Sequence, residues 1–129
     1  MLWDFISGGG VMLDYYKFDE PALNTFKPKE FQGLRIPKEV VKVPVYRLDE
    51  IFRKYKVDYI DFISIDVEGY ELEVLQSNDW ERYIPQYVLV EQKGLSYLEI
   101  ADTEIYQFLV NKGYECDWKS VRTVIYKRV

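Results

Sequence analysis

One stretch of the chain restricts its fold more than any other. Residues 59–67, YIDFISIDV, form a nearly continuous apolar and β-branched run that ends at Glu68 and Gly69. Such a run is typical of a strand covered on both faces, as strands are in parallel sheets. Residues 86–90 form a second run of this kind, and Glu91 stands at its end. The two runs predict a layered fold with a mainly parallel sheet.

Segments with helical periodicity separate the predicted strands. Apolar side chains recur at helical spacing over residues 48–55 and again from residue 70 to about residue 83. A further helix is predicted to begin at residue 102 or 103 and to end at Gly113. Residues 40–46 are rich in β-branched side chains and predict a strand. Because Pro44 has no N–H to donate, this strand is expected at an edge or in a bulged position. This alternation of strand and helix indicates an α/β fold.

The two ends of the chain follow other patterns. A strand is predicted over residues 11–18, after the turn at Gly8-Gly9-Gly10, and a long loop or insertion over residues 21–39. Residues 114–118 and 123–126 predict a closing antiparallel hairpin. With 129 residues the chain is expected to form a single domain, with residues 1–39 as a strand plus loop and residues 40–129 as the alternating core.

Composition excludes several kinds of chemistry. The chain has no His and one Cys, Cys116, so it cannot form an imidazole-based nucleophilic centre, a zinc site that needs imidazole or several thiolates, or an internal disulfide. Its net charge of −5 argues against broad binding to nucleic acid or to an anionic membrane. No basic segment opens the chain, and no apolar run approaches the ~20 residues that span a bilayer. We expect a cytoplasmic protein with no nucleic-acid or membrane partner.

Acidic residues follow both buried-type strands. Ligands of open α/β sheets bind outside the carboxyl ends of the strands, where Asp66, Glu68 and Glu91 fall. Asp66 could face this crevice or cap the next helix, and Glu68 could contact a ligand or bond the backbone N–H groups that begin that helix. Gly69 is expected to have a positive φ or to allow close approach at the turn. Glu71 and Glu73 are predicted to be first-turn partners of the helix dipole.

Further polar residues are candidates for substrate contacts. Glu91 and Gln92 follow the second strand, and with Asp66 they offer the oxygen ligands that Mg²⁺ or Ca²⁺ prefers, although a polar substrate contact is favoured over a metal. Asn24 and Thr25 lie on the long loop, where function concentrates, and Asx-turn chemistry explains Asn24 equally well.

The segment over residues 62–75, FISIDVEGYELEVL, resembles the characteristic segment of the FkbM family of S-adenosylmethionine-dependent methyltransferases. The flanking segments resemble the family in the same order and spacing: VPVYRLDEIF at 43–52, YVLVE at 87–91, FLVNKGYE at 108–115 and the triplet NTF at 24–26. The resemblance covers most of residues 18–128. It implies a Rossmann-like class I methyltransferase sheet and transfer of a methyl group to a hydroxyl of a sugar or secondary metabolite.

Residue roles follow from this resemblance. It implies catalytic roles for Asp66 and Glu68, with Asp66 taking the proton of the acceptor hydroxyl, and contacts of Asp66 and Gly69 with S-adenosylmethionine. Substrate contacts are expected from Glu91, Gln92, Asn24 and Thr25, and no metal ligand is assigned. The acceptor would be a small molecule or a glycan.

The sequence departs from the family pattern in its first part. The family holds the methyl donor with a glycine-rich loop that follows the first strand, whereas Gly8-Gly9-Gly10 precedes a strand. We therefore expect a partial methyltransferase domain. The alternative is a non-catalytic α/β interaction module, or one half of a split or dimeric enzyme, which predicts a homodimer or a complex with a separate amino-terminal half. A third hypothesis is a metal-dependent hydrolase or phosphotransferase built on Asp66, Glu68 and Glu91.

Overall fold

A computed structural model describes residues 11–27 and 36–129. The predicted turn at Gly8-Gly9-Gly10 and the middle of the predicted loop at 21–39 lie outside these residues. The elements, in chain order, are β1 (Val11–Lys17), the 3₁₀ helix η1 (Pro21–Leu23), β2 (Glu39–Val45), α1 (Leu48–Lys54), β3 (Phe62–Ile65), α2 (Glu71–Gln76), β4 (Tyr87–Glu91), α3 (Tyr97–Ala101), α4 (Glu104–Asn111), β5 (Tyr114–Lys119) and β6 (Thr123–Arg128).

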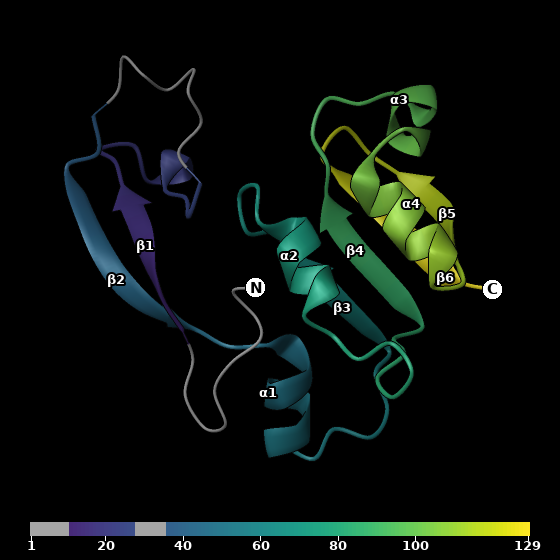
Figure 1. Cartoon of the computed structure of the whole chain (residues 1–129). Coiled ribbons are helices and arrows are strands. Elements are labelled where there is room, and N and C mark those ends of the chain that lie inside the picture. Colours follow the sequence, from purple (N-terminus) through teal and green to yellow (C-terminus); the bar gives the residue numbers. More distant parts are fainter. Residues whose placement is uncertain (1–10, 28–35) are drawn as a thin grey trace.

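The chain forms two sheets (Figure 1). Strands β1 and β2 pair with each other in an antiparallel hairpin, and the larger sheet has the order β3-β4-β6-β5. In the larger sheet β3 and β4 are parallel, whereas β6 is antiparallel to both of its neighbours. The α/β class and the closing β5–β6 hairpin are confirmed, but the prediction of a mainly parallel sheet is wrong for the described residues.

The strand predicted over residues 40–46 is one reason why the sheet is not mainly parallel: it was expected in that sheet, but it belongs to the separate two-stranded sheet. Its β-branched residues favour extended backbone but do not specify a partner strand. In the structure, β2 pairs along its whole length with β1, from Val45 opposite Val11 to Glu39 opposite Lys17. The edge position predicted from Pro44 is confirmed, because both strands of a two-stranded sheet are edges.

Helices α2 and α4 pack on one face of the larger sheet (Figure 1). Leu75 of α2 and Leu109 of α4 are fully buried there against Val88 and Val90 of β4. Strand β6 adds Val124 and Tyr126, which are also fully buried. This core fixes β4 in the middle of the sheet and therefore places its carboxyl end beside that of β3.

The other face of β3 is open. Ile65 is 6% exposed in the core, whereas Phe62 is 59% exposed and Ser64 is exposed as well. The prediction that this strand is covered on both faces is therefore wrong. Among the described strands, β3 pairs only with β4, so β3 is an edge strand.

Two predicted helices differ in detail, and one helix was missed. The α1 stripe is only partly covered, since Tyr55 is 70% exposed. The second predicted helix ends early, at Gln76, and the Ser77 hydroxyl just after it donates to Val74 O and accepts the N–H of Leu48. Helix α3 begins with a capping box of Ser96 and Glu99, a pattern that the sequence contains.

Among the described residues, no helix has both the length and the apolar character needed to span a membrane.

Candidate functional site

Three carboxylates meet where β3 and β4 end. Asp66 follows β3, Glu68 lies in the next turn and Glu91 is the last residue of β4. Their nearest carboxylate oxygens all lie within 4.8 Å of one another. The parallel pairing of Ile65 with Val90 brings these carboxyl ends level, as the sequence predicted. The structure thus brings together the three acidic residues that were expected at this edge.

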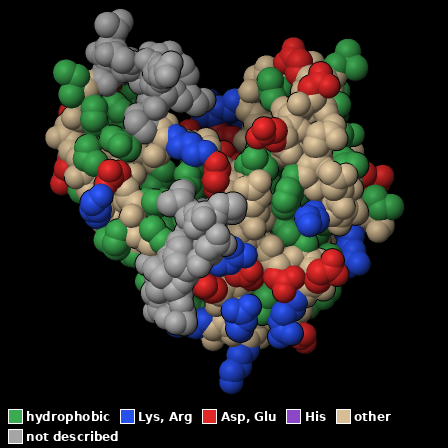
Figure 2. Space-filling view, viewed as in Figure 1, with side chains coloured by type: hydrophobic (Ala, Val, Ile, Leu, Met, Phe, Trp, Pro, Cys, Tyr) green, Lys and Arg blue, Asp and Glu red, His purple; other side chains and the backbone are tan. Residues whose placement is uncertain are grey.

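Lys93 supplies a positive charge to two of the three carboxylates. Its Nζ lies 2.8 Å from Glu91 Oε1 and 3.6 Å from Glu68 Oε2. Asp66 is exposed and has no hydrogen bond or ion pair within the described part of the chain. The space-filling view shows acidic and basic side chains close together in the hollow between the hairpin side and the α3–α4 side of the molecule (Figure 2). The carboxylates have the chemistry and proximity to hold a divalent cation, but Lys93 already neutralises part of their charge.

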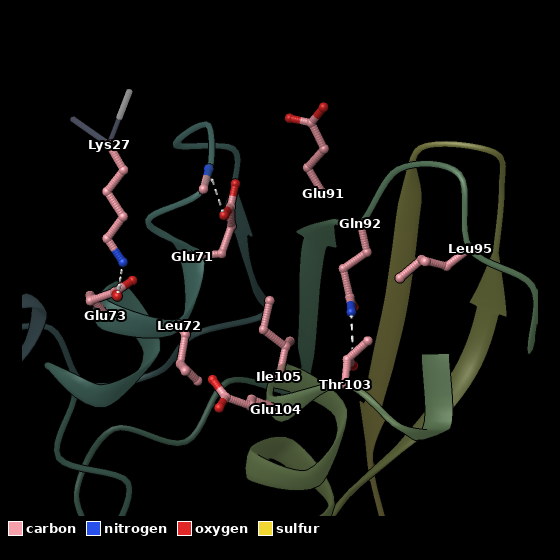
Figure 3. Close-up of a pocket in the computed structure, with 11 residues that line it drawn as sticks. Lys27, Glu71, Leu72, Glu73, Glu91, Gln92, Leu95, Thr103, Glu104 and Ile105 are labelled. Carbon is pink, nitrogen blue, oxygen red and sulfur yellow. Dashed lines mark hydrogen bonds and ion pairs between the residues drawn. The ribbon is translucent and has the colours of Figure 1, made fainter. Parts of the chain in front are cut away.

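Two cavities adjoin this edge of the sheet. The smaller, about 170 Å³, has Asp66, Glu91 and Arg122 in its lining. The larger, about 460 Å³, lies between the beginning of α2, the end of β4 and the beginning of α4. Glu91 lines both cavities. Figure 3 shows Glu91 and Gln92 leaving the end of β4 in opposite directions.

Gln92 is buried, and the described residues use its polar atoms. Its Nε2 donates to Thr103 Oγ1 at 3.2 Å, and its Oε1 accepts from the Tyr126 hydroxyl at 2.6 Å. Burial raises the pKa of Tyr126, so this hydroxyl keeps its proton and acts as a donor. Thr103 is also the N-cap of α4, which confirms the predicted start of that helix. Gln92 thus ties the end of β4 to α4 and β6.

The side chains of Asn24 and Thr25 both bond to backbone groups. The Asn24 side-chain oxygen accepts the N–H of Phe18 at 2.9 Å. The Thr25 side chain is buried, and its hydroxyl donates to the carbonyl of Glu68 at 2.9 Å. The Thr25 contact attaches the β1–β2 hairpin to the turn that carries Glu68.

The turn between β3 and α2 has the predicted backbone conformation at Gly69, with a φ of 98°. Glu68 also has a positive φ, 47°, which the sequence did not predict. Glu68 does not bond the backbone at the beginning of α2. The Glu71 carboxylate does so instead, accepting the N–H groups of Val67 and Gly69.

Sequence reasoning missed several residues of the site. Lys93 and Arg122 received no role in the site, and Thr103 received one only as a helix cap, although Lys93 lies only two positions after Glu91. Glu73 occupies the first turn of α2 as predicted and pairs with Lys27. Lys27 also lies over the Tyr70 ring, 4.8 Å from its centroid. Burial and then the nearby Glu73 carboxylate raise the pKa of Tyr70.

Fold and site together define an α/β protein with a cluster of carboxylates at the carboxyl ends of two parallel strands. The family model described as the methyltransferase FkbM domain matches residues 6–116. The chain therefore belongs to the FkbM methyltransferase family, and this membership indicates methyltransferase activity. Searches of curated proteins and of solved structures found no match.

Proposed function

We propose that this chain forms the acceptor side of an S-adenosylmethionine-dependent O-methyltransferase with a Rossmann-like class I arrangement. The acceptor is a hydroxyl of a sugar or of a secondary metabolite. The observation that carries the proposal is the convergence of Asp66, Glu68 and Glu91 at the carboxyl ends of β3 and β4, in a chain of the FkbM family. An oxygen nucleophile needs alignment and removal of its proton, and a carboxylate can do the second without any His.

Asp66 is the best placed of the three carboxylates to act as the base. It is exposed and, within the described residues, unpaired, whereas Lys93 pairs with Glu91 and Glu68. A bound hydroxyl can therefore reach an Asp66 oxygen directly. With the donor bound, the acceptor oxygen would bond the methyl carbon as the bond from that carbon to the donor sulfur breaks, and the proton of the hydroxyl would pass to this carboxylate. Glu68, held beside Asp66, adds negative charge at the same point.

The residues around the turn suit the chemistry of the donor. S-adenosylmethionine, when bound, supplies a methyl group on a positively charged sulfur, and a carboxylate-rich edge favours a cation. Asp66 and Gly69 are the proposed donor contacts. A Cβ built on Gly69 meets no atom within 4 Å, so the backbone of the turn is open to a neighbour. We propose that a second copy of the chain, or a separately encoded amino-terminal half, supplies the rest of the donor site.

Glu91 is the proposed contact for the acceptor. Its Oε2 is buried and has no hydrogen-bond partner in the described part of the chain. A buried acceptor without a partner favours a ligand that donates a hydrogen bond, as a second hydroxyl of the acceptor would. Gln92, Asn24 and Thr25 are proposed to serve the acceptor indirectly, through the backbone and side-chain bonds described above.

The experiment that tests this function is methyl transfer by Asp66→Asn in the reconstituted or full-length enzyme. If Asp66 is the base, the variant is expected to transfer methyl groups about 10² times more slowly than the wild type, because asparagine cannot take the proton. Transfer of a radioactive methyl group to a panel of sugar and secondary-metabolite acceptors measures the rate. Asp61→Asn is the matched control, since Asp61 is exposed and precedes the opposite end of the same strand. Equal rates in the wild type and Asp66→Asn would remove Asp66 from this role.

The open side of β3 supports a proposal about partners. The edge of β3 is unpaired among the described strands, and Phe62 is 59% exposed on its open face. An unpaired edge next to exposed apolar surface favours association with another strand. We propose that a second copy of the chain, or a separately encoded amino-terminal half, covers this side and completes the enzyme.

A further inference from the structure

The turn that carries Asp66 and Glu68 has an unusual backbone. Glu68 and Gly69 both have positive φ values, 47° and 98°, and a glutamate rarely adopts this conformation. Two successive residues of this kind need support from their surroundings, because the extended and helical alternatives are lower in energy for Glu68. The support comes from two side chains on opposite sides of the turn.

Glu71 holds the turn from the side of α2. It is only 6% exposed, and both of its carboxylate oxygens are in use. Oε1 accepts the N–H of Val67 at 3.2 Å, and Oε2 accepts the N–H of Gly69 at 3.0 Å. One rigid carboxylate thus fixes the two amides that flank Glu68. Hydrogen bonds to an ionised carboxylate are stronger than those between neutral groups, which suits this role.

Thr25 holds the turn from the side of the β1–β2 hairpin. It is 4% exposed and separated from Glu68 by 43 positions in the sequence. Its Oγ1 donates to Glu68 O at 2.9 Å and accepts the N–H of Lys27 at 3.0 Å. The Thr25 backbone pairs with Tyr16 of β1. The hairpin therefore bonds the carbonyl of the very residue that has the strained φ.

We propose that Glu71 and Thr25 are positioning residues, which together hold the turn in the one conformation that directs Asp66 and Glu68 toward Glu91. Both side chains are buried and fully used in bonds to the turn or its neighbours, so they act through Asp66 and Glu68 rather than on a ligand. The hairpin is thereby part of the active site, although none of its strands contributes a carboxylate to the cluster. This inference rests on the proposed methyltransferase function for its catalytic consequence.

The test compares Glu71→Gln, Thr25→Val and Thr25→Ser in the whole chain. Glutamine keeps the shape of Glu71 but presents an NH₂ group to one of the two amides. Valine removes the Thr25 hydroxyl at nearly equal volume, whereas serine keeps it. We expect Glu71→Gln and Thr25→Val to lower kcat about tenfold or more while KM for the acceptor stays within about twofold, and Thr25→Ser to stay close to the wild type. Melting followed by circular dichroism checks that each variant folds.

A readout that does not depend on activity separates this inference from the proposed function. Hydrogen exchange at the Val67 and Gly69 amides is expected to accelerate in Glu71→Gln and Thr25→Val only. The carboxyl-carbon resonances of Asp66 and Glu68 are expected to shift in the same two variants. If neither changes, or if both change while kcat stays at the wild-type value, the inference is overturned. If the wild type transfers no methyl group even together with the part that completes its donor site, the proposed function alone is refuted, and the two spectroscopic measurements still decide whether Glu71 and Thr25 place the carboxylates.

Discussion

At the residue scale, burial distinguishes tyrosines that look alike in the sequence. Tyr114 and Tyr126 are 2% and 0% exposed, and each hydroxyl donates to a buried acceptor, Pro85 O for Tyr114 and Gln92 for Tyr126. Tyr55, Tyr59 and Tyr97 are all more than 60% exposed. A buried phenol must stay protonated, because its ionised form loses both hydration and the bond that it donates.

Tyr114 gives a prediction about stability in alkali. Burial raises the pKa of Tyr114 to about 12, whereas a tyrosine in the unfolded chain titrates near 10. Between these values the unfolded chain has lost a proton that the folded chain keeps, so the free energy of unfolding falls as the pH rises. The contribution is fully present below pH ~10 and is lost by pH ~12. Urea unfolding at a series of pH values from 9 to 12 measures the decline.

Tyr114→Phe is the control for this prediction. The variant lacks the hydroxyl bond to Pro85 O and is expected to be less stable at neutral pH, but its stability should decline less steeply above pH ~10. Burial also raises the pKa of Tyr126, so the free energy of unfolding still falls somewhat with rising pH in both proteins. Parallel curves for the variant and the wild type would show that Tyr114 does not contribute to the slope.

The site residues also show how far a sequence can be interpreted at this scale. Asp66, Glu68 and Glu91 could be expected together, since residues at the ends of parallel strands share one edge of the sheet. The role of Glu71 could not be predicted, because its two bonds depend on a turn whose backbone is fixed by tertiary contacts. The same holds for Thr25, whose partner lies 43 positions away.

At the scale of elements, the hydrophobic pattern of the sequence predicted most strands and helices but not which strands pair with each other. Strand β2 and strand β3 are similar in sequence character, yet one joins a separate hairpin and the other the larger sheet. Pairing depends on the whole chain, so a β-branched run alone cannot specify it. The N-cap Thr103 and the positive φ of Gly113 were predictable, because capping is a local property.

Helix α4 gives a prediction about the core. Leu109 is fully buried between α4 and the sheet, and Leu109→Ala is expected to lower the free energy of unfolding by about 2–5 kcal/mol, because it leaves a cavity. Denaturant unfolding measures the change. Val110→Ala is the matched control: Val110 is the next residue and is 40% exposed, so its change is expected to stay within about 0.5 kcal/mol. Similar losses in both variants would show that α4 is not packed as described.

At the scale of the whole molecule, the hairpin and the larger sheet meet beside α2 (Figure 1). The connections include the Thr25 bond to Glu68, the Lys27–Glu73 ion pair and the packing of Phe26 on Tyr70, whose ring centroids lie 5.6 Å apart. The hairpin thus supports the turn of the site from one side, while the open face of β3, which carries Phe62, lies opposite the face that α2 and α4 cover. A parallel strand with one open face is unusual in an α/β sheet, which supports the proposed partner.

The proposed association gives a prediction for Phe62. If a second copy covers β3, the wild-type sedimentation coefficient rises with concentration, and Phe62→Lys suppresses this rise because a charge on the apolar face opposes its burial. Leu98→Lys is the control, since Leu98 is 84% exposed on α3, away from β3. A wild type that sediments as a compact monomer at every concentration would refute the second-copy form of the proposal. Equal suppression by both lysine variants would indicate general adhesion of exposed apolar side chains, because only Phe62 lies on the open face of the edge strand.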